Sequence, residues 1–409
     1  MSDPGTESIP TCPSDLGLPA PSIIGSIKAQ AEDFVVSELP GYETSGQGEF
    51  LYLQIRRSNL NTKDVAQKLA RAFSMSEAEV GYAGLKDKNA ITTQQFSIPL
   101  IRIPVSPGPE ESLSQLEEDL MKRWPELLEP ELELLQVQRH TNGLRRGHLQ
   151  GNQFSIRIRN LALAAQAQQR KGNDPPVLYS AGDSAGQSSL KKPLKESDGG
   201  SGDSIREILE TCSSHWLRSG FINLYGTQRF GKEGSTLHQG LAFMDGKKAR
   251  KWLLDLGVSA VQSYVFNHYL RLRNEKGQLF HLMNGDLAVK ANSGGIFKVP
   301  VAAEEEARFQ SGEICYTGPM FGKKLRSPEG PSLALEQEAL SYAGRTEEDF
   351  KKMKVPGARR AGLIFLRDLR LEWPGDDSVW MDFTLPAGSY ATVAISHMIQ
   401  LEENSERSL

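Results

Sequence analysis

Alternating apolar and polar residues predict strands near the start of the chain. In EFLYLQIRR (49–57), Leu51, Leu53 and Ile55 alternate with polar and aromatic residues, and this period of two is expected of a half-buried strand. The stretch IKAQAEDFVVSE (27–38) is rich in β-branched and aromatic residues and also suits a strand. The first ordered part of the chain is therefore expected to contribute strands to a sheet.

A helical pattern follows these strands. Val65, Leu69 and Phe73 recur at every fourth position, which puts them on one face of a helix. Asn61 or Thr62 can cap its amino end, because both side chains can accept a hydrogen bond from the first turn. We predict a helix that ends at Phe73 and buries this face.

A later strand is predicted over FSIRIRN (154–160), with one apolar and one basic face. The apolar face consists of Phe154, Ile156 and Ile158, and the other face of Ser155, Arg157 and Arg159. Helical patterns dominate afterwards, at 205–220, 237–256 and 261–273, and strand patterns return after residue 360. A sheet-rich start and finish around a helical middle suggests one domain inserted within another.

Two stretches have the composition of disordered polypeptide. Residues 1–21 are rich in Pro, Ser and Thr, and residues 161–204 combine Gly, Ser, Pro and Gln with few large apolar residues. Such a stretch buries too little apolar surface to offset the entropy lost on ordering. The predicted division of the chain is a disordered lead (1–21), a catalytic domain (22–160 and 356–400), a flexible insertion (161–204), a connecting helix (205–220), an inserted domain (221–355) and a tail (401–409).

Composition and charge narrow the class of protein. The chain has 409 residues, long enough for two or three domains, and its mean hydropathy of −0.41 is that of a soluble globular protein. No window approaches the roughly 20 apolar residues of a membrane span, and no basic region with an apolar core opens the chain. We therefore expect a cytoplasmic protein with no signal peptide, no membrane contact and no evident obligate protein partner.

The net charge of −4 argues against binding nucleic acid by bulk charge, but local charge is segregated. Acids gather at 110–119 and 126–133, and bases at 139–148, 323–326 and 351–360. An acidic protein with one phosphate-binding face would show this segregation. The three cysteines and seven histidines lack the spacing of a metal site, so we expect neither a metal nor a cofactor.

One stretch combines unusual chemistry with small residues. In YAGLKDKNAITTQQF (82–96), Asp87 lies between Lys86 and Lys88, after an Ala-Gly pair and before a run of hydroxyl and amide side chains. Positive neighbours favour the ionised carboxylate that a nucleophile or a general base requires. A solvated surface cluster is the simpler reading of these residues taken alone.

This stretch resembles the signature of the TruD family of pseudouridine synthases, in which an Ala-Gly-x-Lys-Asp core carries the catalytic aspartate. Further blocks follow in the order of that family, and the resemblance covers nearly all of the chain except 1–21 and about 161–204. These blocks are EDFVVSE (32–38), LRRGHLQGNQFSIRIR (144–159), FINLYGTQRFGKEGS (221–235), VQSYVFNHYLRLR (261–273), TGPMFG (317–322) and FTLPAGSYAT (383–392).

The resemblance implies an α+β fold. Its catalytic domain would have the pseudouridine synthase fold, with a mixed and largely antiparallel sheet, and would be interrupted by a largely helical TRUD domain. The chain departs from the family's pattern in the length of 161–204 and in lacking an Arg-Glu pair after the YAT segment. Any role for that pair is therefore in doubt here.

The resemblance also implies an isomerase that converts uridine to pseudouridine in tRNA, most often at uridine 13, without cofactor or metal. Asp87 would be the catalytic residue, and it would either attack the sugar or remove a proton from it. A base flipped out of the RNA would need a pocket. The family match assigns substrate contacts to Phe34, Asn152, Phe383, Phe154 and Lys28.

Core packing is the default explanation for any single Phe of this set, and a surface position explains Lys28 equally well. Two other functions remain open at this point. One is an RNA-binding or tRNA-folding protein of the same fold with vestigial catalysis. The other is a nucleosidase or glycosidase that would release the base.

Overall fold

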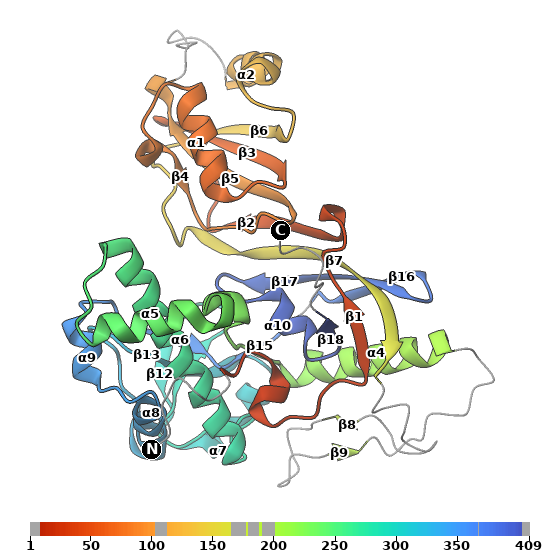
Figure 1. The fold of residues 1–409 in the computed structure, drawn as a ribbon, viewed down its shortest axis with the longest axis vertical. Helices are drawn as coiled ribbons and strands as arrows, with labels where there is room; N and C mark the ends of the chain where they lie inside the picture. Colours follow the sequence, from red (N-terminus) through yellow and green to blue (C-terminus); the bar gives the residue numbers. More distant parts are fainter. Residues whose placement is uncertain are drawn as a thin grey trace. The chain divides into compact units, whose positions relative to one another are not determined.

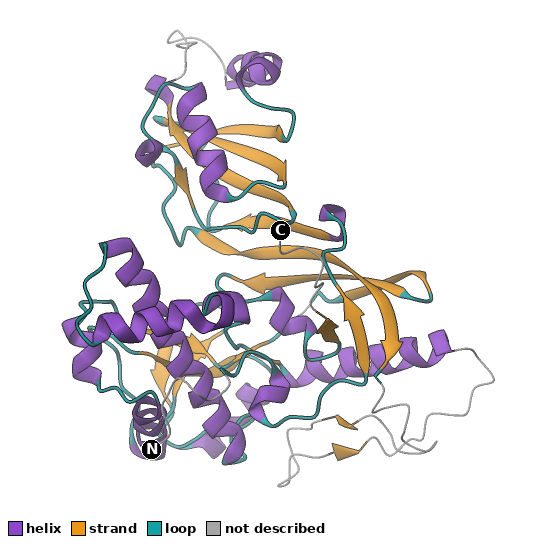
Figure 2. Ribbon diagram, in the orientation of Figure 1, coloured by secondary structure: helices purple, strands orange, loops and turns teal. Residues whose placement is uncertain are grey.

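The computed structural model describes residues 9–102, 113–164, 177–178, 188–189, 201–366 and 368–402. Contacts divide the chain into two compact units (Figure 1). Unit 1 comprises Met1–Gly25, Ala162–Arg367 and Ser389–Leu401, and unit 2 comprises Ser26–Leu161, Asp368–Gly388 and Glu402–Leu409. Figure 2 shows that strands dominate unit 2, whereas helices make up most of unit 1.

Unit 2 is built on a mixed sheet with the strand order β16-β17-β7-β2-β5-β3-β6, and β4 lies beside β5. The pair β2–β5 is parallel and the other pairs in this series are antiparallel. The strands are β2 (Phe34–Pro40), β3 (Phe50–Ser58), β4 (Gly81–Tyr82), β5 (Ile91–Pro99), β6 (Leu132–His140), β7 (Leu149–Leu163), β16 (Arg370–Gly375) and β17 (Ser378–Pro386). The expected mixed, largely antiparallel sheet is confirmed.

The alternation in β3 predicts its buried face correctly, since Leu51, Leu53 and Ile55 are fully buried. They pack in one core with helix α1 (Thr62–Ala72) and helix α2 (Leu113–Leu127). Short 3-10 turns η2 (Ala31–Asp33), η3 (Glu77–Glu79) and η4 (Leu100–Arg102) complete unit 2.

The cap of α1 is also predicted correctly. The Asn61 side chain accepts hydrogen bonds from the backbone N–H groups of Lys63 and Asp64, which would otherwise lack partners at the start of a helix. Val65, Leu69 and Phe73 are buried as expected, so this helix is held to the sheet by the face that its spacing predicts.

Unit 1 combines helices with a four-stranded antiparallel sheet of order β12-β11-β13-β14. Its remaining strands pair as β10–β15 and β1–β18, with β8–β9 as a further short pair. The helices are α4 (Ser201–Ser219), α5 (Ser235–Met244), α6 (Lys251–Glu275), α7 (Ala302–Gln310), α8 (Gly330–Tyr342), α9 (Glu347–Lys352) and α10 (Ala391–Ile395), with 3-10 turns η1 (Pro13–Leu16), η5 (Thr227–Arg229) and η6 (Lys232–Gly234). The strands are β1 (Ile23–Ser26), β8 (Val177–Leu178), β9 (Ser188–Ser189), β10 (Phe221–Ile222), β11 (Leu287–Lys290), β12 (Ile296–Lys298), β13 (Ile314–Met320), β14 (Ala358–Ala361), β15 (Leu363–Ile364) and β18 (Gln400–Glu402).

The middle of the chain differs from the helices predicted there. The pattern over 237–256 suggests one helix, but α5 ends at Met244 and α6 begins at Lys251. Gly246 has φ +98°, a conformation that glycine adopts readily and that ends helices. None of the described helices is both long enough and apolar enough to cross a membrane.

The described part of the amino-terminal lead differs from the disorder expected for 1–21. Residues 13–16 form η1, and Leu16 is buried. Side chains from α6 hold this segment: the Asn267 amide donates to the Pro10 carbonyl at 2.5 Å, and the Asn274 amide donates to the Leu16 carbonyl at 2.9 Å. Side-chain amides on a distant helix thus supply partners that composition cannot reveal.

The contact division also differs from the predicted boundaries. The predicted catalytic domain includes all of 356–400, whereas only 368–388 of that stretch groups with unit 2, and 389–401 groups with unit 1. Most of the flexible insertion predicted at 161–204 lies outside the described residues. Helix α4 begins at Ser201, four residues before the predicted connecting helix.

Candidate active site

Asp87 lies in the loop 83–90, between strands β4 and β5. Its side chain is 51 % exposed, and the Lys28 ammonium nitrogen lies 3.4 Å from its Oδ2. Lys28 has φ +59°, an uncommon conformation for a residue with a side chain. The structure thus joins two residues that the family match selects from distant parts of the chain.

Lys86 and Lys88 flank Asp87 in the sequence, which suggests that both ammonium groups lie beside its carboxylate. In the structure, Lys86 contacts a different carboxylate. The ammonium nitrogen of Lys86 contacts Glu38 Oε2 at 2.9 Å, and both side chains are buried, at 7 % and 2 % exposure. Successive side chains in an extended loop point in different directions, so Lys86 turns inward while Asp87 faces outward. Lys88 is exposed.

A buried hydrogen-bond network holds the loop on both sides of Leu85. On one side, the Gln94 amide donates to the Gly84 carbonyl at 2.8 Å and to Glu38 Oε2 at 3.2 Å. On the other side, the Lys86 backbone N–H donates to the Thr62 hydroxyl at 2.8 Å. The backbone that leads to Asp87 is therefore fixed by side chains from β2, β5 and α1.

Arg57 completes this network. Its guanidinium donates to Gln94 Oε1 at 2.9 Å and to the Thr62 hydroxyl at 3.2 Å. Burial lowers the pKa of Arg57 to about 10, and the Glu38 carboxylate opposes that shift. Arg57 therefore stays charged at neutral pH, where it orients the amide of Gln94.

Sequence reasoning missed the roles of Glu38 and Arg57. Arg57 occupies the next inward position of the alternation that buries Leu51, Leu53 and Ile55. A charged residue at a core position usually has a buried partner, and this signal was available. Gln94 belongs to the run of hydroxyl and amide side chains after Asp87, and the sequence gives no sign that it is buried.

An aromatic row extends across β2, β7 and β17. Phe154 and Phe383 are directly opposite each other in the register of β7 and β17, and their ring centroids lie 5.6 Å apart, stacked. Phe34 meets Phe154 edge-to-face at 6.2 Å, and the Lys28 ammonium lies 4.4 Å from the centre of the Phe34 ring. Lys28 therefore links the Asp87 carboxylate to the aromatic row.

Asn152 lies two residues before Phe154 on the same face of β7. In the register of β2 and β7 it is opposite Glu38. It is buried, and its Oδ1 has no hydrogen-bond partner within the described part of the chain. Because an unsatisfied buried acceptor is costly, this atom is suited to receive a hydrogen bond from a ligand.

An ion pair fixes the turn between Lys28 and Phe34. The Arg159 guanidinium binds both carboxylate oxygens of Asp33 at 2.7–3.1 Å. Asp33 also accepts the backbone N–H of Gln30 at 3.0 Å, which closes turn η2. One residue of the predicted basic face of β7 thus has a structural partner.

Comparison with known proteins identifies the family of this chain. The family model described as tRNA pseudouridine synthase D (TruD) matches residues 18–174 and 247–398. The chain belongs to the TruD family. The matched ranges include Asp87, Lys28 and all members of the aromatic row.

Curated relatives extend over nearly the whole chain. The tRNA pseudouridine synthase D of an Anaeromyxobacter species is 33 % identical over 387 residues, covering 92 % of this chain and 93 % of the relative. The protein of the same name from Thermus thermophilus is 33 % identical over 384 residues, covering 93 % of this chain and 90 % of the relative.

A solved structure supports the fold. The crystal structure of a Methanosarcina mazei protein assigned as a TruD enzyme superposes with a TM-score of 0.61 at 19 % identity, over 97 % of this chain and 96 % of that one. The α+β fold expected from the sequence is therefore confirmed.

Proposed function

We propose that this protein converts uridine to pseudouridine in tRNA, with uridine 13 as the target. The observation that carries the proposal is the half-exposed Asp87 carboxylate, which sits on a loop fixed by buried side chains and contacts Lys28. The aromatic row and the unpartnered Asn152 oxygen accompany it in unit 2. A reacting group and a set of base-binding groups are both needed by this isomerisation.

In the proposed reaction the bond from uracil N1 to ribose C1′ breaks and a bond from C5 to C1′ forms. The proton on C5 is lost and N1 gains one, so the product is an isomer of the substrate. The ionised Asp87 would open the reaction by attack on the sugar or by removal of a proton from it. Lys28 would hold the carboxylate in place between turnovers, because its ammonium lies 3.4 Å away.

The flipped uracil would meet the aromatic row and Asn152. Asn152 Oδ1 would accept the N3–H of the uracil, which satisfies a buried acceptor. Phe34, Phe154 and Phe383 are each more than nine-tenths buried, so only the rim of the row is open to a base. These residues would select a flat pyrimidine by packing, whereas Asp87 would carry the chemistry.

Asp87→Asn tests the proposal most directly. We expect it to abolish pseudouridine formation and to leave tRNA binding within about twofold of wild type, because the amide keeps the shape and loses the charge. Carbodiimide mapping of pseudouridine in tRNA, from cells with and without the gene, measures the activity and the position. Asp376→Asn, an exposed residue of the same unit, is the matched control.

Other outcomes would identify the rival functions. Wild-type protein that binds tRNA but leaves the map unchanged would be an RNA-binding protein with vestigial catalysis. Release of free uracil would identify a glycosidase, since an isomerase releases none. Normal rates in Asp87→Asn would remove Asp87 from the reaction.

A further inference from the structure

The first turns of α6 carry an exposed cluster of basic and apolar side chains in unit 1. Lys247, Lys248, Arg250 and Lys251 precede or begin this helix, and all four are exposed. Trp252 follows at 60 % exposure and Leu256 at 42 %. We call these six residues the α6 patch.

The apolar members of the α6 patch share one side of the helix. Trp252 and Leu256 are four residues apart, so their side chains lie one above the other. From Gly257 onward almost every residue of α6 is buried, through Leu270. The Trp252 side chain therefore lies on a section of α6 that the fold of unit 1 leaves exposed.

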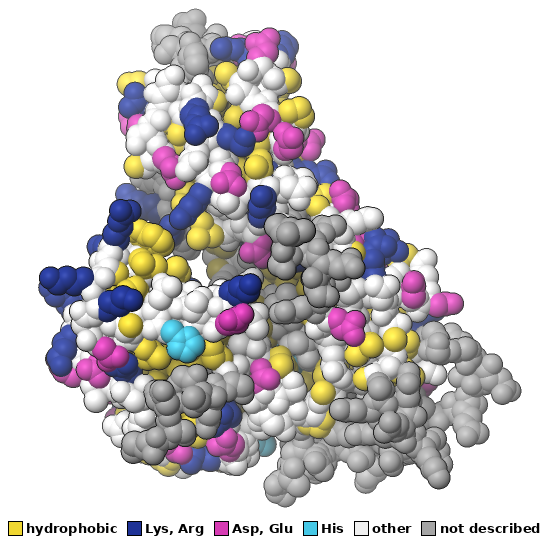
Figure 3. All heavy atoms as spheres, in the orientation of Figure 1, with side chains coloured by type: hydrophobic (Ala, Val, Ile, Leu, Met, Phe, Trp, Pro, Cys, Tyr) yellow, Lys and Arg dark blue, Asp and Glu magenta, His cyan; other side chains and the backbone are white. Residues whose placement is uncertain are grey.

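Close packing of α5 against α6 at Gly257 sets where the exposed start of α6 ends. A Cβ atom built on Gly240 in α5 would lie 2.1 Å from the Gly257 carbonyl oxygen in α6, so only glycine permits this approach. The α6 patch ends at Leu256, directly before Gly257. Figure 3 shows dark blue and yellow side chains next to one another over the part of unit 1 where Figure 1 draws α5 and the start of α6.

The positive charges of the α6 patch are largely uncompensated. The nearest acid in sequence, Asp245, is bound by Arg345 at 2.5 Å. Lys251 contacts Asp255 at 3.3 Å, but within the described residues Lys247, Lys248 and Arg250 form no ion pair with a carboxylate. Bases at the amino end of a helix also oppose its dipole, so these residues are not explained by the stability of α6.

By contrast, most of the basic side chains in the cluster at 351–360 already have partners within the fold. Its residues have the following partners: Lys351 with Glu347 at 3.8 Å, Lys352 with Asp349 at 4.0 Å, Arg359 with Glu336 at 2.5 Å, and Arg360 with Asn223 at 2.5 Å. A base that already binds an internal acid has less charge to offer a phosphate. The α6 patch is therefore a better candidate for an RNA contact than the cluster at 351–360.

We propose that the α6 patch binds tRNA, with its lysines and arginine on phosphates and Trp252 stacked on an unpaired base. Basic groups beside an exposed aromatic ring suit single-stranded or loop RNA, because phosphates and bases alternate along the strand. This contact lies in a different unit from Asp87 and engages nucleotides other than the target uridine. The proposal rests on tRNA being the substrate.

Two sets of variants separate charge from stacking. Lys247→Gln with Lys248→Gln is expected to raise the KM for tRNA and to leave kcat unchanged. It should lower the slope of log affinity against log salt by about one per lysine. Trp252→Ala is expected to weaken tRNA binding roughly 5- to 150-fold with little change in that slope, and Trp252→Phe should restore most of the affinity. Lys276→Gln with Lys298→Gln, two exposed lysines of unit 1 that pair with acids, is the matched control.

Binding is measured by fluorescence anisotropy of labelled tRNA in the Asp87→Asn background, so the result does not depend on turnover. Loss of affinity in the α6 variants alone supports the contact even if no pseudouridine forms in the wild type. Unchanged affinity and salt slope in both variant sets would show that the cluster is only a solvated surface. Equal losses in the control variants would also overturn the proposal, because the effect would then come from net charge.

Discussion

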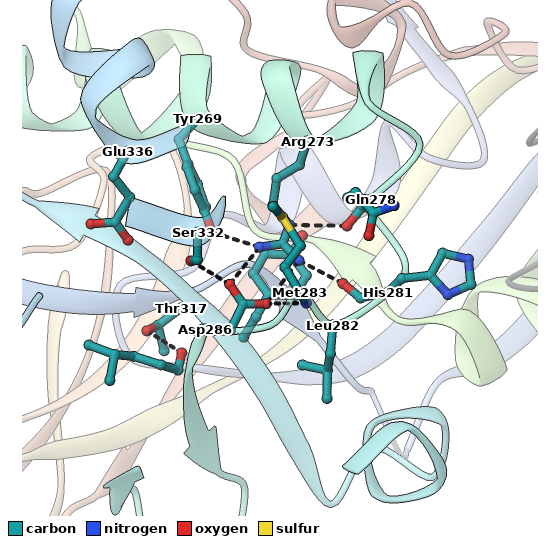
Figure 4. Close-up of polar contacts among 12 residues, drawn as sticks. Tyr269, Arg273, Gln278, His281, Leu282, Met283, Asp286, Thr317, Ser332 and Glu336 are labelled. Atoms are coloured by element: carbon teal, nitrogen blue, oxygen red, sulfur yellow. Dashed lines mark hydrogen bonds and ion pairs between the residues drawn. The ribbon is translucent and has the colours of Figure 1, made fainter. Parts of the chain in front are cut away.

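Each unit of this protein buries an ion pair, and the two pairs are used differently. In unit 1, Arg273 and Asp286 are completely buried and contact at 3.0 Å. Figure 4 shows them within a dense set of polar contacts. In unit 2, Lys86 and Glu38 are buried beside an exposed loop and contact at 2.9 Å.

The unit 1 pair is saturated by structural partners. Arg273 also donates to the Tyr269 hydroxyl and to the carbonyls of Gln278 and His281. Asp286 accepts from the Ser332 hydroxyl at 2.6 Å and from a backbone N–H. This network joins α6, α8 and the segment before β11, and it leaves no atom to act on a substrate.

The unit 2 pair lies next to the proposed catalytic residue. Lys86 is adjacent in the chain to Asp87, so the geometry of the buried pair is transmitted to an exposed carboxylate within one residue. A buried ion pair by itself is therefore no marker of an active site. What distinguishes the two pairs is the exposed acid next to one of them.

The largest expected effect is on folding, in unit 1. Asp286→Asn leaves Arg273 buried without its counter-charge, and we expect the free energy of unfolding to fall by about 3–5 kcal/mol. Chemical denaturation measures this loss. Glu338→Gln, which breaks a half-exposed pair with Lys276, should cost less than about 1 kcal/mol. Equal effects would contradict the structural role given to the buried pair.

A second effect comes from acid. Burial lowers the pKa of His397 to about 4, and its ring nitrogen accepts the Ile222 backbone N–H at 2.9 Å. In the unfolded chain this residue takes up a proton below about pH 6.5, whereas in the folded chain it does so only below about pH 4. Between these two pH values the proton favours the unfolded chain, so the free energy of unfolding falls as the pH falls. The loss from this residue is roughly 2–3 kcal/mol.

Thermal denaturation between pH 7 and pH 4 checks this prediction. His397→Gln should be less stable than wild type at pH 7, and its stability should fall less steeply with acid. An unchanged pH dependence would assign the acid sensitivity to other groups, such as His215, whose pKa burial also lowers to about 4.

The smallest of these expected effects is on turnover, and it is the most informative about the site. Glu38→Gln leaves Lys86 buried without its counter-charge and is therefore also expected to lower the free energy of unfolding. In the folded variant we expect kcat to fall roughly ten- to a hundredfold, because small displacements of the proposed reacting group are costly. The KM should change little. Glu43→Gln is the control, because Glu43 is an exposed acid that, like Glu38, precedes the motif at 82–96 in the chain. An unchanged kcat in Glu38→Gln would mean that the buried pair serves stability alone.

Periodicity predicts the framework of unit 2 well and its polar network poorly. Leu51, Leu53 and Ile55 are buried because a strand with one covered face must alternate. Arg57 continues the same alternation but is buried by partners from β5 and α1. Those partners depend on the register of distant strands, which no local pattern contains.

For the candidate site, too, the sequence predicts one part and not another. The resemblance to the family selects Lys28, Phe34, Asn152, Phe154 and Phe383 from the sequence alone. The structure brings Lys28 to Asp87 and to the aromatic row, and it places Asn152 opposite Glu38 in the sheet. The direction of Lys86 was not predictable, because neighbouring charges in a sequence do not reveal which of them turns inward. The buried Glu38 decides that direction.

The position of β17 has a consequence for the newly made chain. Asp87 and Phe154 are synthesised early, but Phe383, which pairs with Phe154, follows only after the long segment of unit 1 from Ala162 to Arg367. A nascent chain therefore carries Asp87 while β7 still has one unpaired edge, and such an edge can pair with another chain. Completion of the aromatic row therefore coincides with closure of that edge, so both happen in the same late step of synthesis.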